Sequence, residues 1–123
     1  MRNTRRLMVW HRARALVPEL YAATSRFPTS ERYGLTSQIR RAGVSIVANI
    51  AEGAGRGTDG ELGRFLRIAQ GSASEVESLI VIAEDLTILD SATACDLTSS
   101  VNEIRRMMTA LVLRLARDQG GSG

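Results

Sequence analysis

The sequence predicts an all-α fold, an antiparallel up-down-up-down four-helix bundle. Apolar residues recur at steps of three and four along four long segments, which is typical of amphipathic helices. No segment shows the alternation of apolar and polar residues that a half-buried strand requires. Aromatic residues make up only 4% of the 123 residues, so the core must consist of aliphatic side chains, which suits close-packed helices. Short connections between the segments favour antiparallel neighbours.

The first two predicted helices lie before residue 54. Pro18 falls inside the first and predicts a bend, because proline removes a backbone hydrogen bond. The apolar positions of the second are Leu35, Ile39, Ala42, Ile46 and Ile50. We expect this helix to end at Gly53, as a left-handed C-cap. Its start is open, because Pro28 suits a first turn and Gly34 interrupts it.

The third and fourth predicted helices have continuous apolar faces. The third carries Leu62, Phe65, Ala69, Ser72, Val76, Leu79, Ala83 and Leu86. Thr58 and Glu61 precede it as a capping-box pattern, in which the threonine hydroxyl accepts from the Glu61 amide. The fourth carries Leu97, Val101, Ile104, Met108, Leu111 and Leu115. Asp90 or Ser91 is expected to cap its start.

The chain length suits one domain. We expect residues 1–119 to form a single four-helix domain and residues 120–123 to form a flexible glycine-rich tail. No apolar run approaches the roughly 18 residues of a membrane span, and the basic start lacks the apolar stretch of a signal peptide. These observations predict a cytoplasmic protein that does not use a membrane.

The composition restricts the chemistry available to the chain. All 16 basic residues are arginine, which excludes Schiff-base, PLP and P-loop chemistry that depends on lysine. One histidine and one cysteine exclude a zinc site made of such ligands within one chain. We predict no enzyme, no cofactor, no metal site and no catalytic residue. His11 is interpreted as a surface or interface residue, and Cys95 as a buried or half-buried thiol.

Charge is unevenly distributed along the chain. Residues 1–41 hold nine arginines and two acidic residues, whereas residues 57–104 hold two arginines and nine acidic residues. Arginine binds phosphate through paired hydrogen bonds, so the basic clusters suggest nucleic-acid binding without sequence readout. The candidate residues are Arg2, Arg5, Arg6, Arg12, Arg14, Arg40 and Arg41. The alternative is a solvated surface, or arginines that pair with acidic residues of the third helix.

Two further sets of residues need a structural explanation. One face of the second predicted helix is polar and carries Arg41, Ser45, Asn49 and Glu52, with Gln38 and Arg56 beside them. This polar strip is either a solvated face or a hydrogen-bonded network that fixes helix or subunit register. Ile68, Val81, Ile82 and Ile88 lie off the main apolar face of the third helix. We interpret them as a subunit interface in preference to scattered exposed aliphatics.

Several motifs carry a family resemblance. They are Gln38-Ile39-Arg40-Arg41-Ala42, Asn49-Ile50-Ala51-Glu52-Gly53 with Gly55-Arg56, Phe27-Pro28, Tyr33-Gly34 and Phe65-Leu66. Over about residues 7–115, the sequence resembles the bacterial four-helix-bundle family that includes proteins encoded in intervening sequences of 23S rRNA genes.

The resemblance implies a ring-shaped homopentamer without established enzymatic activity. Relatives include accessory proteins of diversity-generating retroelements, which bind reverse transcriptase and nucleic acid. The implied partners are therefore a second copy of the chain, RNA or DNA, and a reverse transcriptase or another protein. An architectural role is implied for the residues that match the family motif and for Ser45 beside them: Gln38, Arg40, Arg41, Ser45, Asn49, Glu52, Gly53 and Arg56.

Overall fold

The computed structural model describes residues 4–121, which form four α-helices and one short 3-10 helix. The elements are α1 (Thr4–Thr24), η1 (Thr29–Glu31), α2 (Leu35–Gly55), α3 (Asp59–Asp85) and α4 (Ser91–Gly121). No strand occurs in this part of the chain, which confirms the all-α class. Helix α4 continues two residues into the segment expected to be a tail.

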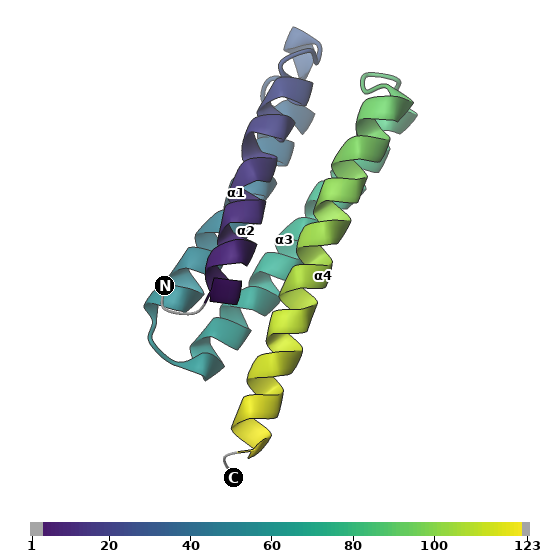
Figure 1. Ribbon diagram of the computed structural model, residues 1–123. Helices are drawn as coiled ribbons and strands as arrows, with labels where there is room; N and C mark the ends of the chain where they lie inside the picture. Colours follow the sequence, from purple (N-terminus) through teal and green to yellow (C-terminus); the bar gives the residue numbers. More distant parts are fainter. Residues whose placement is uncertain (1–3, 122–123) are drawn as a thin grey trace.

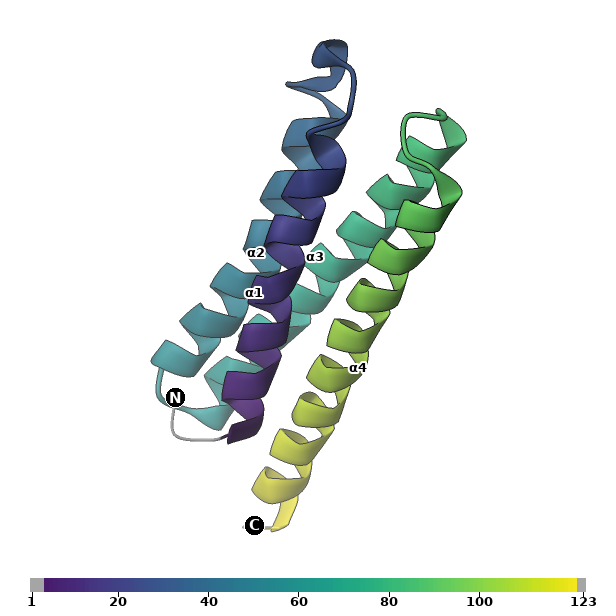
Figure 2. The same ribbon diagram turned by 45° about the horizontal axis from the view of Figure 1, so that its top comes forward.

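The four helices lie side by side (Figures 1 and 2). Helix α1 contacts α2 and α4, and α3 contacts the same two helices. The connections between successive helices lie at alternate ends of the molecule, and α1 begins at the end where α4 finishes. The described residues therefore form a helical bundle, as the periodicity predicts.

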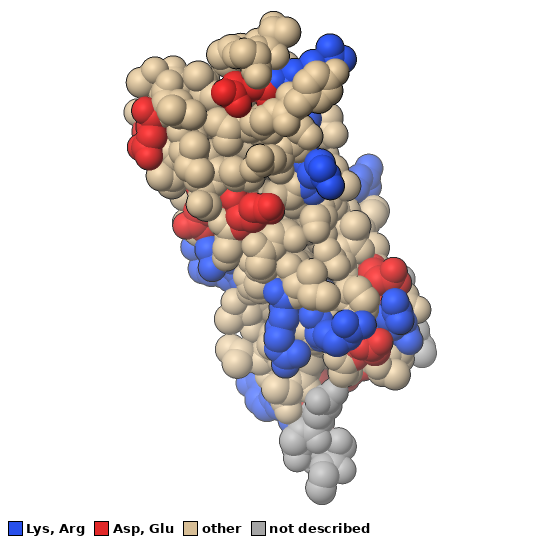
Figure 3. All heavy atoms as spheres, turned by 180° about the vertical axis from the view of Figure 1, so that it is seen from behind, with Lys and Arg blue, Asp and Glu red and all other residues tan. Residues whose placement is uncertain are grey.

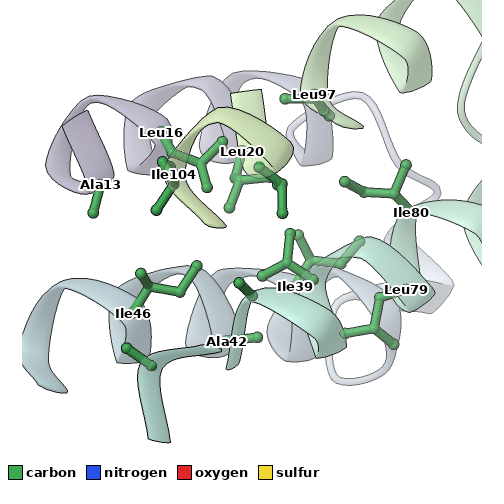
Figure 4. Close-up of a cluster of buried hydrophobic side chains, with 14 of the residues drawn as sticks. Ala13, Leu16, Leu20, Ile39, Ala42, Ile46, Leu79, Ile80, Leu97 and Ile104 are labelled. Atoms are coloured by element: carbon green, nitrogen blue, oxygen red, sulfur yellow. The ribbon is translucent and has the colours of Figure 1, made fainter. Parts of the chain in front are cut away.

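The core consists mostly of aliphatic side chains from all four helices, part of which Figure 4 shows. Large side chains with almost no exposure include Leu16, Leu20, Ile39, Ile46, Ile50, Leu62, Leu66, Ile80, Ile104 and Met108. Burying one such side chain stabilises the fold by about 1.5–3 kcal/mol relative to leaving it in water. The predicted apolar face of α3 is buried except for Ser72, which is half-buried, and Leu86, which is exposed beyond the end of the helix.

Side-chain caps fix the starts of α3 and α4. The Glu61 amide donates to Thr58 Oγ1 over 3.2 Å, which confirms the threonine half of the predicted capping box. Asp90, the first of the two expected caps for α4, accepts from the Thr93 amide at 2.9 Å and from the Thr93 hydroxyl at 2.8 Å. The hydrogen bond from the Thr93 amide, and to a smaller extent the one from the Thr93 hydroxyl, hold the pKa of the Asp90 carboxyl below its ordinary value.

The expectation that α2 ends at Gly53 is wrong. The helix continues to Gly55, and the glycine with a left-handed backbone is Gly57 in the following loop, with φ of +89°. Gly53 is buried against α3, where an added Cβ would lie 2.7 Å from Phe65 Cβ and 3.2 Å from Leu62 Cα. Gly53 therefore allows α2 and α3 to approach closely.

The turn that follows α3 contains a left-handed residue that is not glycine. The Ile88 amide donates to the Ala83 carbonyl at 3.1 Å and the Thr87 amide to the Glu84 carbonyl at 2.9 Å, which is a Schellman motif. Thr87 occupies the glycine position of this motif with φ of +57°. A β-branched side chain is strained in that conformation.

Thr87→Gly is expected to raise the free energy of unfolding by about 1 kcal/mol, because glycine adopts this conformation without strain. Chemical denaturation monitored by circular dichroism measures the change. Thr98→Gly, within α4, is the matched control and is expected to lower stability, because glycine is a poor helix former. A destabilised Thr87→Gly variant would contradict the explanation.

Candidate nucleic-acid interface

A groove of about 530 Å³ lies between α1 and α2. Its lining residues are His11, Arg14, Ala15, Val17, Pro18, Val44 and Val47. Pro18 has no amide hydrogen, so the helical bond to the Arg14 carbonyl is missing beside this groove. The lining combines aliphatic side chains with one guanidinium and one imidazole, and none of these residues is acidic. Arg14 therefore gives this largely apolar groove a positive charge, which suits an anion that also carries an apolar group.

Arg14 is the most available cation of this groove. Its side chain is exposed and forms no ion pair with a described residue. The guanidinium carbon lies 5.3 Å from the centre of the Trp10 ring, and the His11 ring meets Trp10 edge-on at 5.0 Å. The aromatic pair restrains the arginine while its hydrogen-bond donors stay in solvent.

Arg40 and Arg41 follow each other in α2 and have different environments. Arg40 Nε donates to Thr24 Oγ1 at 2.9 Å, and its guanidinium lies 4.4 Å from the Tyr21 ring centre. Arg40 therefore links α2 to the last turn of α1. Arg41 is exposed, and no ion pair joins it to a described residue.

The remaining predicted arginines are divided between ion pairs and undescribed positions. Arg6 pairs with Asp59 at 2.6 Å, and Arg12 with Glu103 at 3.1 Å. Both pairs join segments that are far apart in sequence. The predictions for Arg2 and for the Arg5 side chain lie outside the described residues. On the side seen in Figure 3, basic side chains alternate with acidic ones and broad uncharged areas.

The polar strip on α2 forms hydrogen bonds within α2 and to α3. Ser45 Oγ lies 2.9 Å from Ser72 Oγ, which joins the two helices. Asn49 Nδ2 donates to the Ser45 carbonyl at 2.8 Å and to Ser45 Oγ at 3.0 Å. Ser45 and Ser72 also line a polar groove of about 320 Å³ between α2 and α3, together with Arg41 and Glu75. Gln38 lines the same groove and is exposed.

The other end of the strip is a chain of ion pairs around the α2–α3 loop. Arg56 Nε lies 3.3 Å from Glu52 Oε2, and Arg56 Nη1 lies 3.7 Å from Glu61 Oε1. Arg64 Nε donates to Glu61 at 2.8 Å, and this bond lowers the pKa of the Glu61 carboxyl. The guanidinium groups of Arg56 and Arg64 lie 5.2 and 4.5 Å from the Phe65 ring centre. These contacts hold the loop together. Both exposed arginines at this loop, Arg56 and Arg64, are paired with carboxylates.

The predicted interface residues differ in exposure. Ile68, Val81 and Ile82 are 43%, 52% and 42% exposed on α3. Ile88 is half-buried against the core of its own chain, as part of the motif that ends α3. Three of the four side chains are therefore available to a partner over much of their surface.

The described residues contain no group of three or more histidine, cysteine or acidic side chains placed to hold a metal ion. Cys95 is exposed on α4, so the expectation of a buried or half-buried thiol is wrong. No helix within residues 4–121 is long and apolar enough to cross a membrane.

Sequence reasoning missed two features of the surface. The α1–α2 groove includes Val44 and Val47, which follow Arg40 at steps of four and three and so share its side of α2. That spacing was the available signal. A second groove, between α1 and α4, pairs Met8 with Met107, and no local pattern joins residues so far apart.

Comparisons with known proteins agree with this architecture. The sequence model of the 23S rRNA-intervening sequence protein family matches residues 5–110. The fold is similar to the crystal structure of a protein with unknown function from the S23 ribosomal protein family of Bacteroides thetaiotaomicron, with a TM-score of 0.81 and 17% sequence identity. The similarity covers 88% of this chain and 97% of that chain, and at this identity it supports the fold alone. A comparison with curated proteins found no match. The family match covers most of the sequence, and the chain therefore belongs to the 23S rRNA-intervening sequence protein family.

Proposed function

We propose that the protein is a non-enzymatic homo-oligomer, built from antiparallel up-down-up-down bundles, that binds nucleic acid through exposed arginines of α1 and α2. The alternate placement of the helix connections supports the antiparallel topology (Figure 1). The exposed aliphatic side chains of α3 support self-association. The ring-shaped pentamer is proposed from the family resemblance, as is a reverse transcriptase or another protein as partner. Cytoplasmic location stays a prediction.

One observation carries the nucleic-acid proposal. Arg14 and Arg41 are exposed on adjacent helices and form no ion pair with a described residue, whereas Arg6 and Arg12 are paired. A guanidinium group without an ion-pair partner can bind a phosphate through two parallel hydrogen bonds. Each such contact releases counterions from the nucleic acid. In an oligomer these cations repeat around the symmetry axis, which strengthens attraction to a polyanion.

A second candidate is an assembly in which the charged faces are used between subunits. The exposed carboxylates of Glu75 and Asp85 favour it, because they form no ion pair with a described residue. Glu77, by contrast, already pairs with Arg105 of its own chain at 2.6 Å. This function needs no nucleic acid.

Fluorescence anisotropy with labelled RNA and DNA at increasing salt tests the first function. The wild-type affinity is expected to fall as salt rises, because binding releases counterions. The double variant Arg14→Ala/Arg41→Ala is expected to reduce the slope of log affinity against log salt by about 2, since each phosphate contact contributes about 0.9.

The double variant Arg12→Ala/Arg64→Ala is the matched control, because it removes the same formal charge from arginines that are paired with carboxylates. Its salt slope is expected to stay close to that of the wild type. Absence of binding at low salt, or binding without salt dependence, would exclude the nucleic-acid function and leave the structural assembly.

A further inference from the structure

A basic groove of about 380 Å³ lies between α1 and α4. Its lining residues are Met8, Val9, Met107, Ala110, Leu111, Arg114 and Arg117. Val9 and Leu111 are buried and form the floor, whereas Met8 is 54% exposed. Methionine side chains adapt to the shape of an apolar partner. Arg114 and Arg117 lie one turn apart on α4 and form no ion pair with a described residue, so this groove offers an adaptable apolar surface beside two cations.

An acidic face of matching chemistry lies on α3. One side of this helix carries four residues spaced at steps of three, four and three: Glu75, Ser78, Ile82 and Asp85. All four are exposed, and Val81 beside them is exposed as well. The two carboxylates therefore flank aliphatic side chains that the bundle itself leaves in water.

The two surfaces cannot meet within one copy of the chain. The basic groove lies where α1 begins and α4 finishes, while the acidic face lies on the half of α3 that leads to the other end of the bundle (Figure 1). A contact between them requires two molecules. Because the two surfaces differ, such a contact is heterologous, and a repeated heterologous contact generates either a closed ring or an open filament.

We propose that the basic groove of one copy binds the acidic face of α3 of a second copy. Arg114 and Arg117 bind the carboxylates of Glu75 and Asp85, which adds charge-assisted hydrogen bonds to the contact. Val81 and Ile82 enter the groove against Met8 and Met107, which removes exposed apolar surface from water. This inference rests on the proposed self-association and assigns the surfaces that produce it.

Charge reversal on each surface, with the full chain, tests the contact. The groove variant is Arg114→Glu/Arg117→Glu and the face variant is Glu75→Arg/Asp85→Arg. Sedimentation and light scattering measure self-association, and circular dichroism confirms that each variant is folded. Each variant alone is expected to self-associate at least roughly a hundredfold more weakly than the wild type, because like charges now meet.

Mixing the two variants is the decisive measurement. The reversed groove of one then meets the reversed face of the other, while their unaltered surfaces form the wild-type pair. The mixture is therefore expected to associate again, as alternating open chains or even-membered rings, because a five-membered ring cannot alternate two variants. Arg32→Glu and Asp96→Arg reverse exposed charges outside both surfaces and serve as controls that are expected to associate normally.

The outcomes separate the inference from the proposed function. A wild-type chain that is monomeric at all concentrations would contradict the self-association itself, and the inference with it. An associated wild type whose variants also remain associated would overturn the inference alone. Variants that dissociate singly but do not associate on mixing would show that the two surfaces do not bind each other, which also overturns it.

Discussion

Gly53→Ala is expected to lower the free energy of unfolding by about 1–3 kcal/mol, the usual range for overpacking a well-packed interior. The same exchange within an unconstrained helix raises stability by up to about 1 kcal/mol, because alanine is the better helix former. At Gly53 the added methyl would lie 2.7 Å from Phe65 Cβ and 3.2 Å from Leu62 Cα. Leu62 Cα is backbone, so relief requires α2 and α3 to separate.

Gly71→Ala is the matched control for this prediction. Gly71 lies within α3, is exposed, and has no atom within 4 Å of the position that a Cβ would occupy. This variant is expected to gain about 0.5–1 kcal/mol. Thermal and chemical denaturation of both variants measure the difference, which at this chain length corresponds to about 4 °C in Tm per kcal/mol. Equal shifts of both variants in the same direction would contradict the close approach at Gly53.

The role of Gly53 also shows what the sequence can predict of the fold. The four helices follow from periodicity, because buried positions on a helix must recur every three or four residues, and the Thr58 cap follows from local hydrogen bonding. A glycine near the end of an apolar pattern, however, is compatible with a left-handed cap and with close helix packing. Only the position of the neighbouring helix decides between them, and that position is not a local property.

The candidate site was predictable to a smaller extent for the same reason. The excess of arginine before residue 42 is visible in the sequence, but the partners of individual arginines are not. Arg6 pairs with a residue 53 positions away, and Arg12 pairs with Glu103 on α4. Tertiary packing thus removes some cations from the surface and leaves others, such as Arg14, available for a ligand.

Arg40→Ala and Arg41→Ala are expected to change different properties, stability and nucleic-acid binding respectively, although the two residues are adjacent in α2. Arg40→Ala is expected to lower the free energy of unfolding by about 1–3 kcal/mol. It removes the 2.9 Å bond from Nε to Thr24 Oγ1 and the contact with the Tyr21 ring. The Thr24 hydroxyl is buried and still donates to the Leu20 carbonyl at 2.8 Å, but it loses the donor that it accepts from.

Arg41→Ala is expected to change stability by less than about 0.5 kcal/mol, because the side chain is exposed and unpaired among the described residues. Its effect should instead appear in nucleic-acid binding, as a salt slope smaller by about 1. Denaturation and anisotropy measured on the same two variants separate the roles.

Arg40→Lys refines the comparison, because lysine keeps the charge but lacks the planar fork that reaches Thr24 and stacks on Tyr21. It is expected to lose stability and to retain the salt slope. A stable Arg40→Ala variant with a reduced salt slope would instead place Arg40 among the residues that bind phosphate.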